Sequence, residues 1–249
     1  VVEVMLLGQN VNSYGKTLEH PMTFAQLLRE IEKIDKIERI RFMTSHPKDL
    51  SDELIETMAK SKKICHHLHL PLQSGSSRIL KAMNRRYDKE KYLNLVDKIR
   101  TAIPDISLTT DIIVGFPGET EEDFEESYEF VKKIHFYETH IFKYSRRHGT
   151  KAASMDGQLT EAAKAQRSDR MLELHEIRAR EYEEAMIGKK MELLLEEEIE
   201  IDGRPWYVGH SREYVRAVIS KTDAHRVNDL VTVKAVAFVR DHILETKEV

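Results

Sequence analysis

The stretch Leu108–Phe124 combines an apolar run with a turn that contains two glycines and a proline. The run predicts a buried strand, and Thr120 followed by Asp123 predicts a helix N-terminus directly after the turn. Glycine lets backbone approach a ligand where a Cβ would not fit. Because acidic residues crowd the helix start and would repel phosphate, we expect the turn to hold a flat base or a cation. An ordinary strand-to-helix connection is the alternative.

A second stretch, Cys65–Ser77, repeats the order of strand, Gly/Ser turn and helical run. Strand alternation places His67 and His69 on one face, with Gln73 following the same parity. The strand would therefore carry a polar face inside an otherwise buried sheet. A packed polar strand is the simplest interpretation of this face.

The same two histidines allow a different chemistry. Two histidines on one strand face at the ligand end of a barrel are how a zinc site of the His-x-His type begins. The rival hypothesis is therefore a zinc-dependent barrel hydrolase that uses His67 and His69. Candidates for its further ligands are Cys65, Asp111, His46 and His148. In the favoured interpretation we assign no metal ligand and no catalytic residue.

Strand-like and helix-like segments alternate around these stretches. The pattern predicts an α/β fold with five strand-then-helix units and a final strand, because parallel strands need helical crossovers. We expect a partial (βα) TIM-like barrel, with function at the carboxyl ends of its strands. The expected strands are Val1–Leu7, Ile40–Met43, the start of Cys65–Ser77, Leu108–Val114 and Thr139–Tyr144; the expected helices are Phe24–Ile34, Asp52–Lys60, Arg78–Met83 and Glu121–Ile134. Polar or glycine residues at the strand ends are Gln9, Asn10, Ser45, His46, Gln73, Ser74 and Gly115.

The pattern changes after a long predicted helix, Thr160–Ile187, which Gly188 ends. The remaining segments are short, β-rich and separated by turns, and Asp202-Gly203 is a hairpin signal. We predict one domain over residues 1–187 and a second, small all-β barrel over residues 188–249. The strands expected there are Met191–Leu195, Ile199–Ile201, Trp206–Val208, Tyr214–Ile219 and Leu230–Val239.

Composition excludes several classes. Of the 249 residues, 41% are hydrophobic and 33% charged, which is typical of a soluble globular protein. No apolar run approaches the roughly 20 residues of a membrane span, and no leader precedes the first strand. The single cysteine excludes an internal disulfide and suits the cytoplasm. The net charge of -4 gives no global signature of nucleic-acid binding, so any RNA contact must use a local patch.

Five separated motifs together resemble the radical S-adenosylmethionine (SAM) methylthiotransferases, most closely the branch that modifies transfer RNA. The motifs are LLGQNVNSYG, SHPKD, LHLPLQSGS, KAMNRRY and LTTDIIVGFPGETEEDF, in that order along the chain. The resemblance implies a radical-SAM barrel followed by a TRAM module, an OB-like β-barrel. It covers nearly the whole chain.

The resemblance implies SAM and two [4Fe-4S] clusters as cofactors of the full-length protein. Clusters require thiolate ligands, and the family's three-cysteine loop is absent from this sequence. We therefore expect a fragment that lacks the first βα unit and the N-terminal domain, and that is inactive by itself. The residues implied to face SAM are Gly8, Gln9, Asn10, Gln73, Ser74, Arg85, Val114, Gly115, Phe116 and Gly118.

The activity implied is radical methylthiolation of N6-isopentenyladenosine next to the anticodon of a tRNA, with the anticodon stem-loop as partner. Alternatives within the family are threonylcarbamoyl-adenosine and a ribosomal-protein aspartate as substrates. A non-catalytic RNA-binding fragment is a third alternative. The RNA-binding candidates are Arg204, Trp206, Arg212, Arg216 and Lys221, and the acidic run Glu196–Glu198 would have to face away from them.

Overall fold

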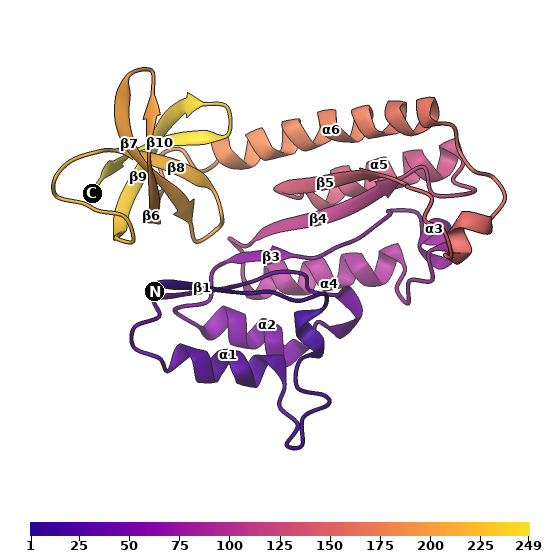
Figure 1. The fold of residues 1–249 in the computed structure, drawn as a ribbon, viewed down its shortest axis with the longest axis horizontal. Helices are drawn as coiled ribbons and strands as arrows, with labels where there is room; N and C mark the ends of the chain where they lie inside the picture. Colours follow the sequence, from indigo (N-terminus) through magenta and orange to yellow (C-terminus); the bar gives the residue numbers. More distant parts are fainter.

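The computed structural model describes all residues, 1–249, and divides them into a layer of parallel strands with helices and a separate β-barrel (Figure 1). All strand pairs in the first part are parallel. The strands are β1 (Glu3–Leu6), β2 (Arg39–Phe42), β3 (His67–His69), β4 (Ser107–Val114) and β5 (Glu138–Lys143). The helices are α1 (Phe24–Glu32), α2 (Asp52–Lys60), α3 (Ser77–Ala82), α4 (Lys89–Ala102), α5 (Glu121–Ile134) and α6 (Glu161–Glu184), with short 3-10 turns at Val11–Ser13, Pro47–Asp49 and Lys151–Ser154.

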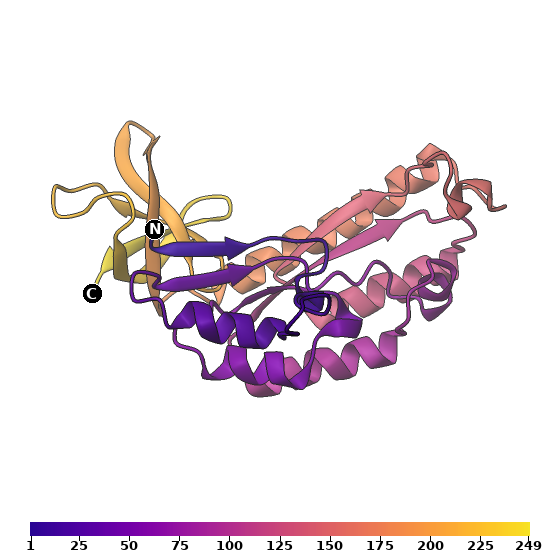
Figure 2. The ribbon, with the colours of Figure 1, turned by 60° about the horizontal axis from the view of Figure 1, so that its bottom comes forward.

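The predicted alternation of strands and helices is confirmed, and all five listed strands are present, but they form four strand-then-helix units and a final strand where five units were expected. Four strand-then-helix units lead to β5, and α6 then packs along β5 (Figure 1). The two-stranded sheet β1-β2 and the three-stranded sheet β3-β4-β5 are linked by a bridge between Ile40 and Ile64 and by a hydrogen bond from the Ser45 N–H to the carbonyl of His69. The whole layer is open and curved and does not close into a barrel (Figure 2). Thr120 caps α5 as the sequence predicts, and the side chains of Thr23 and Ser51 cap α1 and α2. None of the helices is both long and apolar enough to cross a bilayer.

The two faces of the sheet differ because strand side chains alternate. Ile40 and Phe42 of β2 join the main core, which packs between the sheet and its helices, as Figure 2 shows for α1 and α2. Arg39 and Arg41 point to the opposite, inner face. Both arginines are nevertheless almost fully buried, so another part of the chain must cover them.

That cover is the second part of the chain, a closed barrel of five strands in the order β10-β8-β7-β6-β9. Asp202 and Gly203 both have positive φ, as the predicted hairpin turn requires. Two of the predicted strands are one continuous strand, and a last strand was missed. The strands are β6 (Lys190–Ile201), β7 (Arg204–Ser211), β8 (Arg216–Ser220), β9 (Leu230–Arg240) and β10 (Ile243–Glu248).

The turn between β7 and β8 closes the amino-terminal end of the inner face. Tyr214 lies between the rings of His67 and His210, with centroid distances of 4.8 and 4.5 Å, and Arg41 lies 4.9 Å from its ring centre. Arg39 completes the contact through an ion pair of 2.9 Å with Glu192. The carboxyl ends of the strands, at the other end of the inner face, remain free of this cover (Figure 1).

Candidate functional site

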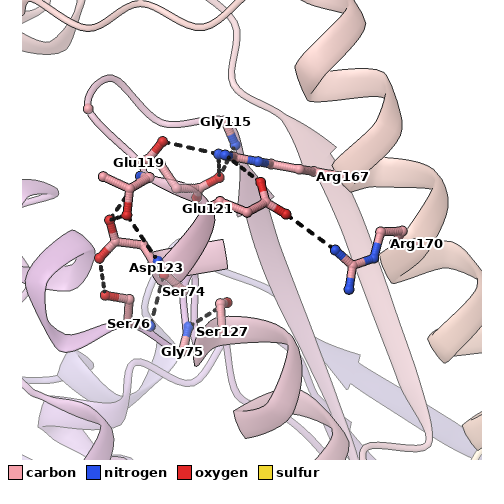
Figure 3. Close-up of polar contacts among 12 residues, drawn as sticks. Ser74, Gly75, Ser76, Gly115, Glu119, Glu121, Asp123, Ser127, Arg167 and Arg170 are labelled. Atoms are coloured by element: carbon pink, nitrogen blue, oxygen red, sulfur yellow. Dashed lines mark hydrogen bonds and ion pairs between the residues drawn. The ribbon is translucent and has the colours of Figure 1, made fainter. Parts of the chain in front are cut away.

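The two motif turns at the carboxyl ends of β3 and β4 are tied together by the first turns of helix α5 (Figure 3). The Ser76 hydroxyl donates a hydrogen bond of 2.9 Å to Asp123, and the backbone N–H of Gly75 donates one of 2.8 Å to the Ser127 hydroxyl. A Cβ on Gly75 would lie 2.7 Å from Cα of Ser127. This glycine therefore serves the close packing of the turn on α5.

The turn after β4 is anchored by a buried acid (Figure 3). Glu119 accepts a hydrogen bond of 2.9 Å from the backbone N–H of Gly115 and one of 2.6 Å from Arg167 of α6. Burial raises the pKa of Glu119, and these two hydrogen bonds oppose the shift. Glu119 therefore holds the turn after β4 in place through contacts inside the protein.

Gly115 was expected to leave room for a ligand beside the backbone, and the structure contradicts this. Its φ of +73° is the left-handed conformation that glycine adopts most readily, and a Cβ there would lie 2.5 Å from Cγ of Lys164. The space beside this glycine is filled by a lysine side chain of α6, so it is not left open for an adenosyl group. Gly118, by contrast, has open space where a Cβ would stand.

A cleft of about 490 Å³ does lie at the strand ends. Three of the predicted residues, Gln73, Arg85 and Phe116, line it together with Ile113 at the end of β4. An adjoining hollow of about 280 Å³ contains Asn10 and again Arg85. Arg85 therefore lines both the cleft and the hollow. The volume of the cleft is typical of small-molecule sites.

Backbone strain and unpartnered polar groups gather at the same strand ends. Thr44 and Gln73 have φ of 66° and 76°, which residues with a side chain rarely adopt. Buried atoms without a hydrogen-bond partner include Asn10 Oδ1, the Ser45 hydroxyl and the Tyr144 hydroxyl. Such groups are costly unless a ligand or water satisfies them. Thr44 and Tyr144 were not expected here, because the sequence does not reveal their strain or burial.

The other predicted cofactor residues lie outside the cleft. Gly8 and Gln9 are exposed in the loop after β1. Ser74 and Val114 are almost fully buried, and the Ser74 hydroxyl accepts a hydrogen bond of 3.2 Å from the backbone N–H of Ser76. The carbonyl of Gly118 accepts a hydrogen bond from Arg78.

The chain does not fit an iron–sulfur cluster. Cys65 is the only cysteine, is 1% exposed, and stands before β3, at the end of the sheet opposite the cleft. Burial raises the pKa of its thiol, which disfavours the thiolate that a cluster needs. One such residue cannot supply a cluster's ligand set.

The proposed zinc pair is wrong in one of its two members. The ring of His67 is stacked on Tyr214, and its Nδ1 is buried without a partner. His69 instead lies with Asp111 and with His140 of β5, in one group whose ligand atoms are all within 4.8 Å of one another. His140 was missed, because its place depends on the pairing of β4 with β5.

The predicted RNA-binding residues are mostly occupied by contacts within the protein. Trp206 is buried in a small apolar cluster and cannot stack a base at the surface. Arg212 donates to the carbonyl of Ile64, across the junction with the first part of the chain. The expectation that the acidic run faces away is wrong. Glu196 pairs with His210, Glu197 with Arg216 and Glu198 with Lys221. Because Arg212 pairs with Glu192, Arg204 is the only one of the four candidate cations without an ion pair.

Comparison with known proteins agrees with the predicted family. Residues 1–131 match the model of the Radical SAM superfamily. The chain is 55% identical over 202 residues to the tRNA-2-methylthio-N(6)-dimethylallyladenosine synthase of Lachnoclostridium phytofermentans, covering 81% of this chain and 44% of that protein. It is 51% identical over 235 residues to the synthase of the same name from Alkaliphilus oremlandii, covering 94% of this chain and 49% of that protein. The chain thus spans about half the length of the curated relatives it matches. The chain belongs to the radical SAM superfamily.

Proposed function

We propose that this chain is the SAM-facing and RNA-contacting part of a tRNA methylthiotransferase that acts on N6-isopentenyladenosine beside the anticodon, in the cytoplasm. The observation that carries the proposal is the cleft at the strand ends, where Gln73, Arg85 and Phe116 converge in a chain whose curated relatives are synthases of this kind. The whole activity would belong to a longer protein.

The cleft offers groups that match the parts of SAM. The edge of the Phe116 ring could contact the adenine, and the Arg85 guanidinium could bind the carboxylate with two hydrogen bonds. In the adjoining hollow, the unpartnered Oδ1 of Asn10 could accept a hydrogen bond from the amino group. SAM supplies the methyl group and, with a reduced cluster, the radical chemistry of this family. The two [4Fe-4S] clusters of the proposed parent find no ligands here, so this chain by itself should be inactive.

For RNA, the cations at the cleft are better placed than those of the β-barrel. Lys48, Arg86 and Lys151 are exposed and form no ion pair. The cleft shares Arg85 with the hollow of 280 Å³ and Lys151 with a third hollow of about 680 Å³. A strand of RNA could follow this line of cations, because unpaired lysines and arginines release counterions when they meet phosphates.

We also propose that the domains meet near residue 187 and that the β-barrel over residues 188–249 is a TRAM module of OB-like type. Its closed five-stranded form supports this. Because Trp206 is buried, the β-barrel would not read bases through it. The β-barrel would instead hold the first domain, through Tyr214 against His67 and through Glu192 paired with Arg39.

Filter binding of anticodon stem-loops, measured over a range of salt concentrations, tests the RNA part. We expect the double variant Arg86→Ala/Lys151→Ala to weaken binding and to reduce the slope of log K against log salt by about 1.4, or about 0.7 for each phosphate contact. The matched variant Arg216→Ala/Lys221→Ala removes two cations already paired with acids and should change the slope little. If instead only Arg216→Ala/Lys221→Ala reduces the slope, the RNA contacts the β-barrel and not the cleft. Binding of stem-loops that bear isopentenyladenosine or threonylcarbamoyl-adenosine then tests which of the two substrates is preferred.

A further inference from the structure

Three side chains from adjacent strands meet on the inner face of the sheet, below the cleft. His69 comes from β3, Asp111 from β4 and His140 from β5. Asp111 and His140 are direct partners in the β4-β5 register, and His69 pairs with Thr109, two residues before Asp111. Their positions are therefore fixed by the backbone of three paired strands, which is more rigid than a loop.

The separation of the ligand atoms suits a single ion. Nε2 of His69 lies 3.5 Å from Oδ2 of Asp111. Two ligands bound to one ion at about 2.1 Å with a tetrahedral angle would be about 3.4 Å apart. The rings of His69 and His140 have centroids 5.6 Å apart, and the ligand atoms of all three residues lie within 4.8 Å of one another.

A hydrogen bond orients the buried histidine. Nδ1 of His69 lies 2.9 Å from the hydroxyl oxygen of Thr109, so a proton on Nδ1 leaves the lone pair of Nε2 directed toward Asp111. A partner of this kind on the far nitrogen is usual for histidines that bind metals.

The other two residues are free to take a ligand. No N–H or O–H group donates a hydrogen bond to the carboxylate of Asp111, whose side chain is 25% exposed, and the imidazole of His140 has no hydrogen-bond partner and is exposed. The carboxylate of Asp111 and the imidazole of His140 can therefore bind an ion without breaking a hydrogen bond within the protein.

We propose that His69, Asp111 and His140 form a binding site for one divalent transition-metal ion, such as zinc or ferrous iron. Two imidazole nitrogens and one carboxylate are a donor set that these ions accept, and the exposed side leaves further coordination positions open. The site is independent of the proposed tRNA activity. On β4, Asp111 precedes by two residues Ile113, which lines the cleft.

Titration of the whole chain with Co²⁺, followed by visible absorption, and with Zn²⁺, followed by calorimetry, tests the proposal. We expect one equivalent of each ion to bind. His140→Gln and Asp111→Asn should each weaken binding at least 10-fold, and Thr109→Val, which removes only the orienting hydroxyl, by about 10- to 100-fold. His148→Gln removes an exposed histidine away from the group and should leave binding unchanged.

Circular dichroism of each metal-free variant checks the fold, and His140→Gln is the decisive variant because its side chain is exposed. The proposal is overturned if the wild-type chain binds less than stoichiometric metal, or if His140→Gln and Asp111→Asn bind as the wild type does. It is also overturned if the wild type binds no metal while the same variants lose affinity for adenosine, since the group would then contact the base directly.

Discussion

The hydroxyl of Ser76 donates a hydrogen bond of 2.9 Å to Oδ1 of Asp123, 47 residues further along the chain. Ser76 precedes α3 and Asp123 lies in the first turn of α5, so this bond joins the turns that follow β3 and β4. The cleft residues Gln73 and Phe116 stand on those two turns. The cleft therefore depends on a link that makes no contact with a ligand.

Removing the carboxylate of this link should cost stability. Asp123 accepts hydrogen bonds from Ser76, from the backbone of Thr120 and from Arg78. We expect Asp123→Ala to lower the free energy of unfolding by about 2–4 kcal/mol, measured by urea denaturation, because it removes the acidic member of the α5 capping box and leaves buried donors unpaired. Glu122→Ala, one residue earlier and exposed, should change it by less than about 0.5 kcal/mol. If the two variants lower the free energy of unfolding equally, the hydrogen bond between Ser76 and Asp123 does not contribute to stability as we propose.

The same carboxylate should make the protein sensitive to acid. Burial alone would raise the pKa of Asp123, but hydrogen bonds from Arg78, Thr120 and Ser76 outweigh it and hold the pKa well below the ordinary value of 3.8. A carboxyl with a lowered pKa in the folded state stabilises it above pH 3.8, and that stability is lost as the pH falls toward the folded pKa. Between about pH 5 and 2, the free energy of unfolding should fall less steeply in Asp123→Asn than in the wild type. If the free energy of unfolding falls with pH equally steeply in the variant and the wild type, this prediction is contradicted.

Gly75 should tolerate no side chain. A Cβ there would lie 2.7 Å from Cα of Ser127 and 2.8 Å from Cβ of Phe130, so α5 would have to move. We expect Gly75→Ala to lower the free energy of unfolding by about 3 kcal/mol. Gly8→Ala is the matched control, because its Cβ would meet only Val11, at 3.3 Å, and should cost less than about 1 kcal/mol. A mild effect at Gly75 would show that the turn and α5 are less closely packed.

Tyr214 should couple the two parts of the chain. Its ring is stacked between His67 of β3 and His210 of β7. Tyr214→Ala should lower the free energy of unfolding by about 2–4 kcal/mol. We expect calorimetry to show one unfolding transition in the wild type and two in this variant. Tyr14→Ala removes a 40% exposed ring and should leave one transition. A single unshifted transition in Tyr214→Ala would refute the coupling.

Local signals in the sequence predicted local structure well. The helix start at Thr120 and the turn at Asp202-Gly203 depend on a few neighbouring residues, and the structure confirms them. The family was also identifiable, because its motifs are continuous in the chain.

Relations between distant residues were not predictable in the same way. Gly115 was interpreted as room for a ligand, whereas the Lys164 side chain, 49 residues further along the chain, occupies that room. His140 has an unremarkable place in its own strand and joins His69 only through the register of β4 with β5. Nothing local shows that the acids at 196–198 face the cations of the neighbouring strands, because strand pairing decides which charges meet.

Equilibrium dialysis of the intact chain against labelled SAM tests the central claim most directly. The account predicts saturable binding that competes with S-adenosylhomocysteine and that Arg85→Ala weakens at least 10-fold, while Lys133→Ala, an exposed cation at the far end of α5, leaves it unchanged. If the wild type shows no saturable binding, or if Arg85→Ala and Lys133→Ala bind alike, the strand-end cleft is not the SAM site.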